Sequence, residues 1–94
     1  MVDLVWLPEA QDDLRRLYEF IAPHSEEAAA RAMMTLVTAA ETLLDFPQKG
    51  RPWQPDRAFR ELSVSFGAGS YVIRYREYAD QVVIVRIWHA REER

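Results

Sequence analysis

The chain has 94 residues, of which 49% are hydrophobic and 12% aromatic, so it can build one domain around a single core and is not a disordered segment. It has no cysteine, which excludes disulfide bonds and thiolate-bound metals, and its net charge is −3. Its first residues carry neither a basic flank nor a long apolar run, so the sequence predicts a cytoplasmic protein without a membrane span.

Charge is divided unevenly along the chain. Residues 1–48 carry nine acidic and three basic side chains, whereas residues 49–94 carry nine basic and six acidic ones. Eight of the nine bases in the second half are arginines, whose planar guanidinium suits carboxylates and phosphates better than an ammonium does. The pattern predicts a basic surface formed by the second half; the alternative is that the arginines only decorate solvated strands.

The first half predicts a strand followed by two helices. The run at 2–6 is typical of a short strand, and Pro8 suits the first turn of a helix that ends near Ala22, because a proline follows. Ser25 is a suitable N-cap for a second helix over about 26–45. The short link between the helices favours an antiparallel hairpin.

The second half predicts a loop and three strands. Three prolines and a glycine make 46–57 a loop, and alternating apolar and polar residues predict strands over 61–66, 71–76 and 82–87. The order β-α-α-β-β-β indicates one α+β domain over 1–94, in which a helical hairpin packs on one face of a mainly antiparallel sheet.

The same alternation assigns side chains to the two faces of the sheet. If Tyr71 and Tyr75 face the helices, Arg74 and Arg76 face away. On the last strand we expect three apolar residues to face the helices: Val83, Val85 and Ile87. The uncovered side is then expected to mix charge with apolar surface: Val72, Arg74, Arg76, Ile84, Arg86 and Trp88. Such a mixture is typical of a partner-binding surface.

Five short motifs, in order, carry a resemblance to a known family. They are WLPEAQDDL (6–14), FPQKGRP (46–52), FREL (59–62), SYVIRYR (70–76) and IWHAR (87–91). Together they resemble the ParE/RelE superfamily of bacterial toxins, and the ParE branch more than the RelE branch. The resemblance implies the toxin of a type II toxin–antitoxin pair, which the C-terminal segment of a small antitoxin binds and neutralises. It also implies a target, since ParE members are associated with inhibition of DNA gyrase and RelE members with ribosome-dependent mRNA cleavage.

Cleavage of mRNA is the alternative function, and it needs groups that take and give a proton, with cations on the phosphate. The candidate residues are Arg60, Glu61, His89 and Arg91. The resemblance places Val72 where the RelE branch has a strand arginine, and the lysines that flank the preceding strand in that branch are absent. We therefore expect no catalytic site. Two histidines far apart in the chain, His24 and His89, and the absence of a glycine-rich phosphate loop predict neither a metal nor a cofactor.

The interpretation as a binding toxin assigns the basic residues to macromolecular partners. The expected partner-binding residues are Arg60, Arg74, Arg76, Arg86, Trp88 and Arg91. The expected partners are DNA gyrase and a cognate antitoxin with an acidic C-terminal segment, the latter in a hetero-oligomeric complex. We expect DNA contact only through the antitoxin, because the chain is acidic overall and lacks a recognition-helix pattern. A third interpretation is a non-toxic relic or a DNA-binding co-repressor subunit.

Overall fold

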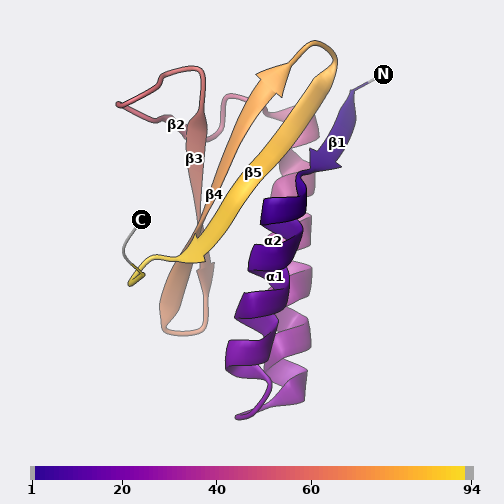
Figure 1. Ribbon diagram of the computed structural model, residues 1–94, viewed down its shortest axis with the longest axis vertical. Helices are drawn as coiled ribbons and strands as arrows, with labels where there is room; N and C mark the ends of the chain where they lie inside the picture. Colours follow the sequence, from indigo (N-terminus) through magenta and orange to yellow (C-terminus); the bar gives the residue numbers. More distant parts are fainter. Residues whose placement is uncertain (1, 93–94) are drawn as a thin grey trace.

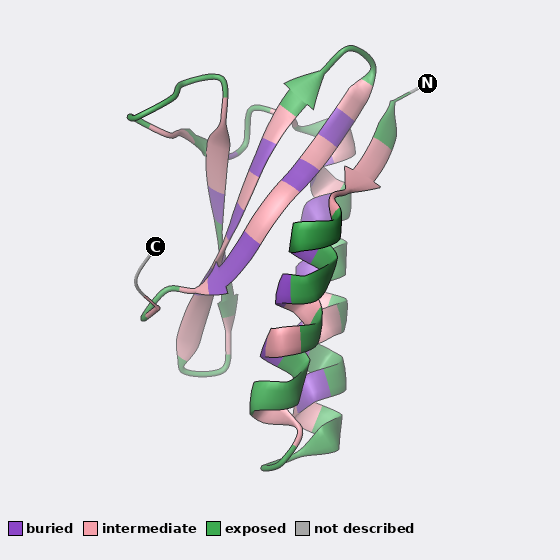
Figure 2. Ribbon diagram, viewed as in Figure 1, coloured by how far each residue is buried: buried purple, intermediate pink, exposed green. Residues whose placement is uncertain are grey.

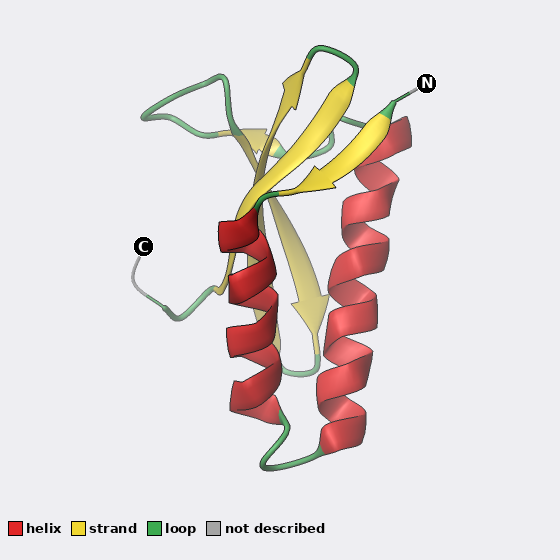
Figure 3. Ribbon diagram, turned by 45° about the vertical axis from the view of Figure 1, so that its right-hand side comes forward, coloured by secondary structure: helices red, strands yellow, loops and turns green. Residues whose placement is uncertain are grey.

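Two helices lie side by side along one face of a five-stranded sheet (Figure 1). The structure, a computed structural model, describes residues 2–92. Helix α1 covers Pro8–Ile21 and helix α2 covers Glu26–Asp45, and the two run antiparallel, as Figure 3 shows. Neither helix is long and apolar enough to cross a membrane, and the same holds for every helix within the described residues.

The sheet has the strand order β1-β5-β4-β3-β2. The strands are β1 (Asp3–Trp6), β2 (Arg51–Pro52), β3 (Arg60–Phe66), β4 (Gly69–Tyr78) and β5 (Gln81–His89). Strand β1 pairs parallel with β5, and all other pairs are antiparallel. The predicted α+β class, element order and mainly antiparallel sheet are confirmed. The short strand β2 lies in the segment predicted as a loop, because two residues, one of them proline, give no strand periodicity.

Local sequence signals set the bounds of the helices. Pro8 opens α1, where its missing N–H has no partner to lose, and the Ser25 hydroxyl accepts a hydrogen bond from the Ala28 N–H at 3.1 Å to cap α2. Leu36 and Leu43 of α2 are fully buried. Three fully buried alanines allow close packing along α2: Ala29, Ala32 and Ala40.

The core lies between the helices and the covered face of the sheet, and buried residues alternate along β4 and β5 in Figure 2. Tyr75 is its largest fully buried side chain. The Tyr75 hydroxyl donates to the Pro47 carbonyl at 2.7 Å and accepts the Gly50 N–H at 2.8 Å. Tyr75 thereby fixes the segment that follows α2, and burial raises the pKa of its hydroxyl. A Cβ at position 50 would lie 2.7 Å from the Tyr75 ring, so this close approach requires glycine.

The facing predicted for β4 is confirmed, but that predicted for the first half of β5 is wrong. Tyr71, Ile73 and Tyr75 are buried. On β5, however, Val82 and Ile84 are the buried residues, and Val83 and Val85 lie on the other side. The cause is a bulge: Arg74 pairs with Arg86, whereas the next residue, Tyr75, pairs with Ile84. The extra residue, Val85, shifts the alternation by one position, after which Ile87 is buried as expected.

Candidate functional site: the open face of the sheet

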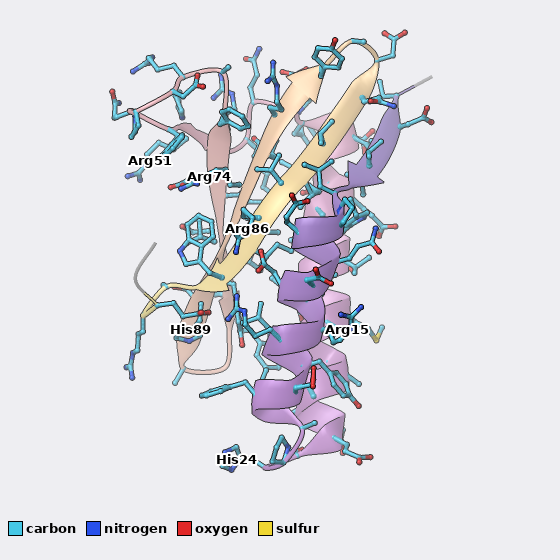
Figure 4. All side chains as sticks on the ribbon, in the orientation of Figure 1. Arg15, His24, Arg51, Arg74, Arg86 and His89 are labelled. Atoms are coloured by element: carbon cyan, nitrogen blue, oxygen red, sulfur yellow. The ribbon has the colours of Figure 1, made fainter. Side chains whose placement is uncertain are left out.

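The open face is the side of the sheet that the helices leave uncovered, and a row of four charged residues crosses it. Arg51, Glu61, Arg74 and Arg86 are successive cross-strand partners from β2 to β5. Figure 4 shows Arg51, Arg74 and Arg86 in that order across the sheet. Directly opposed residues share a face, so one carboxylate stands between two guanidiniums in this row.

Arg74 is held in a sandwich of two tryptophans. Its guanidinium carbon lies 3.9 Å from the ring centroid of Trp53 and 4.8 Å from that of Trp88. Its Nε and Nη2 donate to Glu61 Oε2 at 3.0 and 2.8 Å. The side chain is 19% exposed, so this cation is largely satisfied inside the chain.

The predicted binding residue Trp88 offers little surface to a partner. It shares the open face with Arg74, yet it is only 7% exposed. Trp53, which completes the sandwich, comes from the proline-rich segment that the sequence predicts as a loop. No periodicity in the sequence predicts its contact with Arg74, because that contact depends on how the segment folds over β3 and β4.

Arg86 is not a free cation of the open face, contrary to the expectation. Its Nε donates to Asp13 Oδ2 at 2.8 Å and its Nη2 to Asp13 Oδ1 at 3.1 Å. Asp13, on α1 and 4% exposed, also accepts the backbone N–H of Ile87 at 2.8 Å. In the part of the chain that the structure describes, the edge of β5 beyond its pairing with β1 has no strand partner, and Asp13 takes that place. The hydrogen bond that Arg86 donates to Asp13 raises the pKa of Arg86.

Arg16 extends this network to the segment that follows β5. Its Nη1 donates to Glu92 Oε2 at 2.6 Å, and its Nη2 lies 3.5 Å from Asp13 Oδ1. Glu92 Oε1 accepts the backbone N–H of His89 at 2.8 Å. The hydrogen bond with Glu92 raises the pKa of Arg16. The ion pairs therefore join α1, β5 and the residues up to Glu92.

The four candidates for mRNA cleavage are not brought together on one surface. Arg60 pairs with buried Tyr75 on the covered side and donates to the Gly50 carbonyl at 2.9 Å, whereas Glu61 lies on the open face. His89 stands three residues beyond Arg86, about 10 Å further along β5, and its ring meets Tyr71 edge-on at 5.1 Å. The exposed Arg91 contacts His89 through its backbone N–H, which donates to Nδ1 at 3.1 Å.

Arg76 stands apart from the other predicted binding residues. It lies two residues beyond Arg74 on the open face, and its guanidinium carbon is 5.2 Å from the Phe59 ring and 5.4 Å from the Tyr78 ring. Its Nε is buried and has no hydrogen-bond partner among the described residues. Within residues 2–92 no carboxylate forms an ion pair with it.

Within residues 2–92 no group of three or more His, Asp or Glu side chains could hold a metal ion. His24 lies at the turn between the two helices, whereas His89 lies at the end of β5 (Figure 4). A shallow groove runs between α2 and the outer edge of β3. It is lined by Arg31, Met34, Thr35, Thr38, Ala39, Val64 and Phe66.

An antiparallel helical hairpin packs on a sheet whose first strand pairs parallel with its last, which is the α+β architecture that the resemblance to the ParE/RelE superfamily implies. The sequence model described as "ParE toxin of type II toxin-antitoxin system, parDE" matches residues 4–94, and the chain belongs to this family. It is therefore the toxin of a type II toxin–antitoxin system, and the family implies a cognate antitoxin.

Curated relatives agree with this assignment, and a solved structure shows the same fold. The chain is 41% identical to Toxin RelE3 of Caulobacter vibrioides over 87 residues, which cover 93% of this chain and 92% of that one. It is 39% identical to Toxin RelE1 of the same organism over 85 residues, covering 90% and 89%. A structure titled "Chromosomal ParDE TA system from P. aeruginosa" superposes with a TM-score of 0.78 at 23% identity, covering 95% and 96%, and shows the same fold.

Proposed function

We propose that this toxin acts in the cytoplasm by binding DNA gyrase, and not by cleaving mRNA. The observation that carries the proposal is the separation of the candidate proton-transfer groups. Glu61 accepts a hydrogen bond from Arg74, and Arg60 donates to a backbone carbonyl. His89 lies three residues beyond Arg86, about 10 Å further along β5. General acid–base catalysis requires such groups within hydrogen-bond reach of one substrate.

The remaining chemistry of the open face suits a protein partner. Arg51 and Arg76 of the open face, and Arg91 beyond the end of β5, have no ion-pair partner within the described residues. Tyr78 beside Arg76 is 63% exposed. Arginine next to exposed aromatic surface is the combination enriched at the centre of protein interfaces. Membership of the ParE family supports gyrase as that partner.

The cognate antitoxin is proposed to use two surfaces of the toxin. An amphipathic antitoxin helix fits the groove between α2 and β3, where Met34 is 69% exposed and Phe66 lies at the rim. An extended acidic segment would follow the open face or add to the unpaired part of the β3 edge. In this arrangement the antitoxin carries the DNA contacts, because the toxin is acidic overall.

Ribosome-dependent mRNA cleavage is the second candidate. It is favoured by the names of the curated relatives, which are 39–41% identical to this chain and are called RelE toxins. His89 and Arg91 adjoin one another at the end of β5 and are the residues that this alternative would use.

A supercoiling assay with purified toxin and gyrase tests the proposal. We expect supercoiling to stop in a dose-dependent manner, while ribosome-bound mRNA incubated with the same sample remains intact in primer extension. Unimpaired supercoiling at a large molar excess of toxin, together with cleaved mRNA, would establish the second candidate instead. Growth arrest on expression without the antitoxin separates either activity from a non-toxic relic.

A further inference from the structure

Among the described residues 2–92, Arg76 is the half-buried cation of the open face that lacks a carboxylate. Arg74 has Glu61 and Arg86 has Asp13, each through two hydrogen bonds. For Arg76, no ion pair exists within residues 2–92, and its Nε is shielded from solvent without a hydrogen-bond partner. A buried donor without a partner is unfavourable, and it is rare in folded proteins. An acceptor supplied from outside the chain would engage the charge that the fold leaves uncompensated.

The surroundings of Arg76 hold its guanidinium in place. Phe59 and Tyr78 provide aromatic rings at 5.2 and 5.4 Å, and Val83 is its cross-strand partner on β5. Two aromatic rings and one valine thus form a frame beside the cation. Such a frame reduces the rotamer freedom of the arginine and lowers the local dielectric constant, which strengthens a hydrogen bond to an anion.

Phe59 is itself fixed by the turn that precedes β3. Its carbonyl accepts the Trp53 N–H at 2.9 Å and its N–H donates to the Asp56 carbonyl at 3.0 Å. The rings of Phe59 and Trp53 meet edge-on with centroids 6.2 Å apart. The frame around Arg76 therefore belongs to the same ordered segment that supplies one side of the Arg74 sandwich.

We propose that Arg76 is the receptor for a single carboxylate of the antitoxin, seated between Phe59 and Tyr78. The terminal guanidinium nitrogens, Nη1 and Nη2, donate to the carboxylate in parallel, and the frame around them packs against the adjoining part of the antitoxin chain. The proposal rests on the toxin–antitoxin assignment and is independent of whether gyrase is the target.

The chemistry of the site favours a carboxylate over nucleic acid. A phosphate backbone is bound by several cations along a track, whereas the neighbours of Arg76 on the open face are an already paired Arg74 and apolar side chains. One isolated cation inside an apolar frame matches one side-chain carboxylate on a protein. The overall charge of −3 further disfavours a polyanion.

A double-mutant cycle tests the site, with the full-length cognate antitoxin as the probe. The toxin variant is Arg76→Gln, and each Asp and Glu in the C-terminal part of the antitoxin is replaced in turn by Asn or Gln. We expect Arg76→Gln to weaken binding by about 10- to 100-fold. With the unchanged toxin, replacement of one particular antitoxin acid should weaken binding by the same factor. With the Arg76→Gln toxin, the same replacement should weaken binding little further.

Two companion variants separate this role from a general charge effect. Arg15→Gln removes an exposed cation on α1, paired only with Asp12, and should change binding by less than about twofold. Arg76→Lys keeps the charge but not the planar fork and should give an intermediate loss. Thermal denaturation confirms folding of each variant. Binding by Arg76→Gln within twofold of wild type, or a loss that adds independently to that of every antitoxin acid, would overturn the proposal. Failure of gyrase inhibition alone would leave it standing.

Discussion

The carboxylate of Asp13 and the guanidinium of Arg86 lie 73 residues apart in the chain and form a two-point ion pair, with Nε–Oδ2 and Nη2–Oδ1 distances of 2.8 and 3.1 Å. The same carboxylate accepts the N–H of Ile87 at the edge of β5. This contact fixes α1 against the sheet and engages Arg86 inside the chain. It explains why a basic second half of the chain gives fewer free cations than its arginine count predicts.

Loss of the Asp13 carboxylate should destabilise the fold. In Asp13→Asn, the buried side chain can no longer compensate Arg86 and Arg16, so we expect the free energy of unfolding to fall by about 2 to 4 kcal/mol, the partial exposure of Arg86 limiting the loss. Urea denaturation measures it. The matched control is Asp12→Asn, next in the chain and in an exposed ion pair with Arg15, which should change stability by less than about 0.5 kcal/mol. Equal losses of stability in the two variants would show that the ion pairs of Asp13 do not stabilise the fold.

Stability should depend on pH through the same carboxylate. Burial raises the pKa of Asp13, but the hydrogen bonds from Arg86 and the Ile87 N–H outweigh burial and hold the pKa below its ordinary value. A carboxyl whose pKa is lowered by folding stabilises the protein above its unfolded pKa, near 4, and loses that contribution as the pH falls through the folded value. We expect the free energy of unfolding to decline from about pH 5 downward. The decline should be shallower in Asp13→Asn, and an unchanged slope in that variant would contradict the assignment.

The tryptophan sandwich should require arginine specifically. Arg74→Lys keeps the charge but loses the planar group that stacks on Trp53 and Trp88, and it cannot reproduce the paired donation to Glu61. We expect a loss of about 1 to 2 kcal/mol and a red shift of tryptophan emission as the rings become more solvated. The control Arg57→Lys alters an exposed arginine that donates only to Gln54 and should leave both readings unchanged. An unshifted spectrum in Arg74→Lys would argue against the sandwich in solution.

The turn between β4 and β5 offers a stabilising change. Ala79 has a φ of 54°, the only positive φ of a non-glycine residue within residues 2–92. Because the Cβ of an L-residue is strained there, Ala79→Gly should raise the free energy of unfolding by up to about 1 kcal/mol. Ala68→Gly, in the other tight turn but without a positive φ, should lower it by about 0.5 kcal/mol through the added freedom of the unfolded chain. Thermal melts of the two variants should therefore shift in opposite directions, and shifts in the same direction would contradict the explanation.

The helices could be predicted from residues that mark their beginnings in the local sequence. The face to which a strand side chain points could not be predicted where two alternations are equally apolar. Pro8 and Ser25 mark the beginnings of both helices, as the structure confirms. On β5, by contrast, Val82–Ile84 and Val83–Val85 are equally apolar alternations, so only the bulge decides between them. The apolar periodicity of a strand does not predict whether it contains a bulge.

The site was harder to predict than the fold because its pairings are long-range. The face of Arg74 and Arg76 follows from alternation on β4, but the Glu61 partner depends on strand register and the Asp13 partner on how α1 crosses the edge of β5. Trp53 and Phe59 come from a segment with no periodicity at all. Arginine count alone therefore overestimates the free charge of the open face, which the ion pairs reduce.

Binding of DNA gyrase by this toxin can be measured at equilibrium with the two purified proteins. We expect saturable binding that weakens between about 0.1 and 1 M salt, because unpaired arginines of the open face contribute to it. We expect the same affinity for His89→Gln, since no proton transfer is involved. A toxin that arrests growth yet shows no binding to gyrase at any attainable concentration, and whose growth arrest is abolished by His89→Gln in a folded protein, would show that gyrase binding is not its activity.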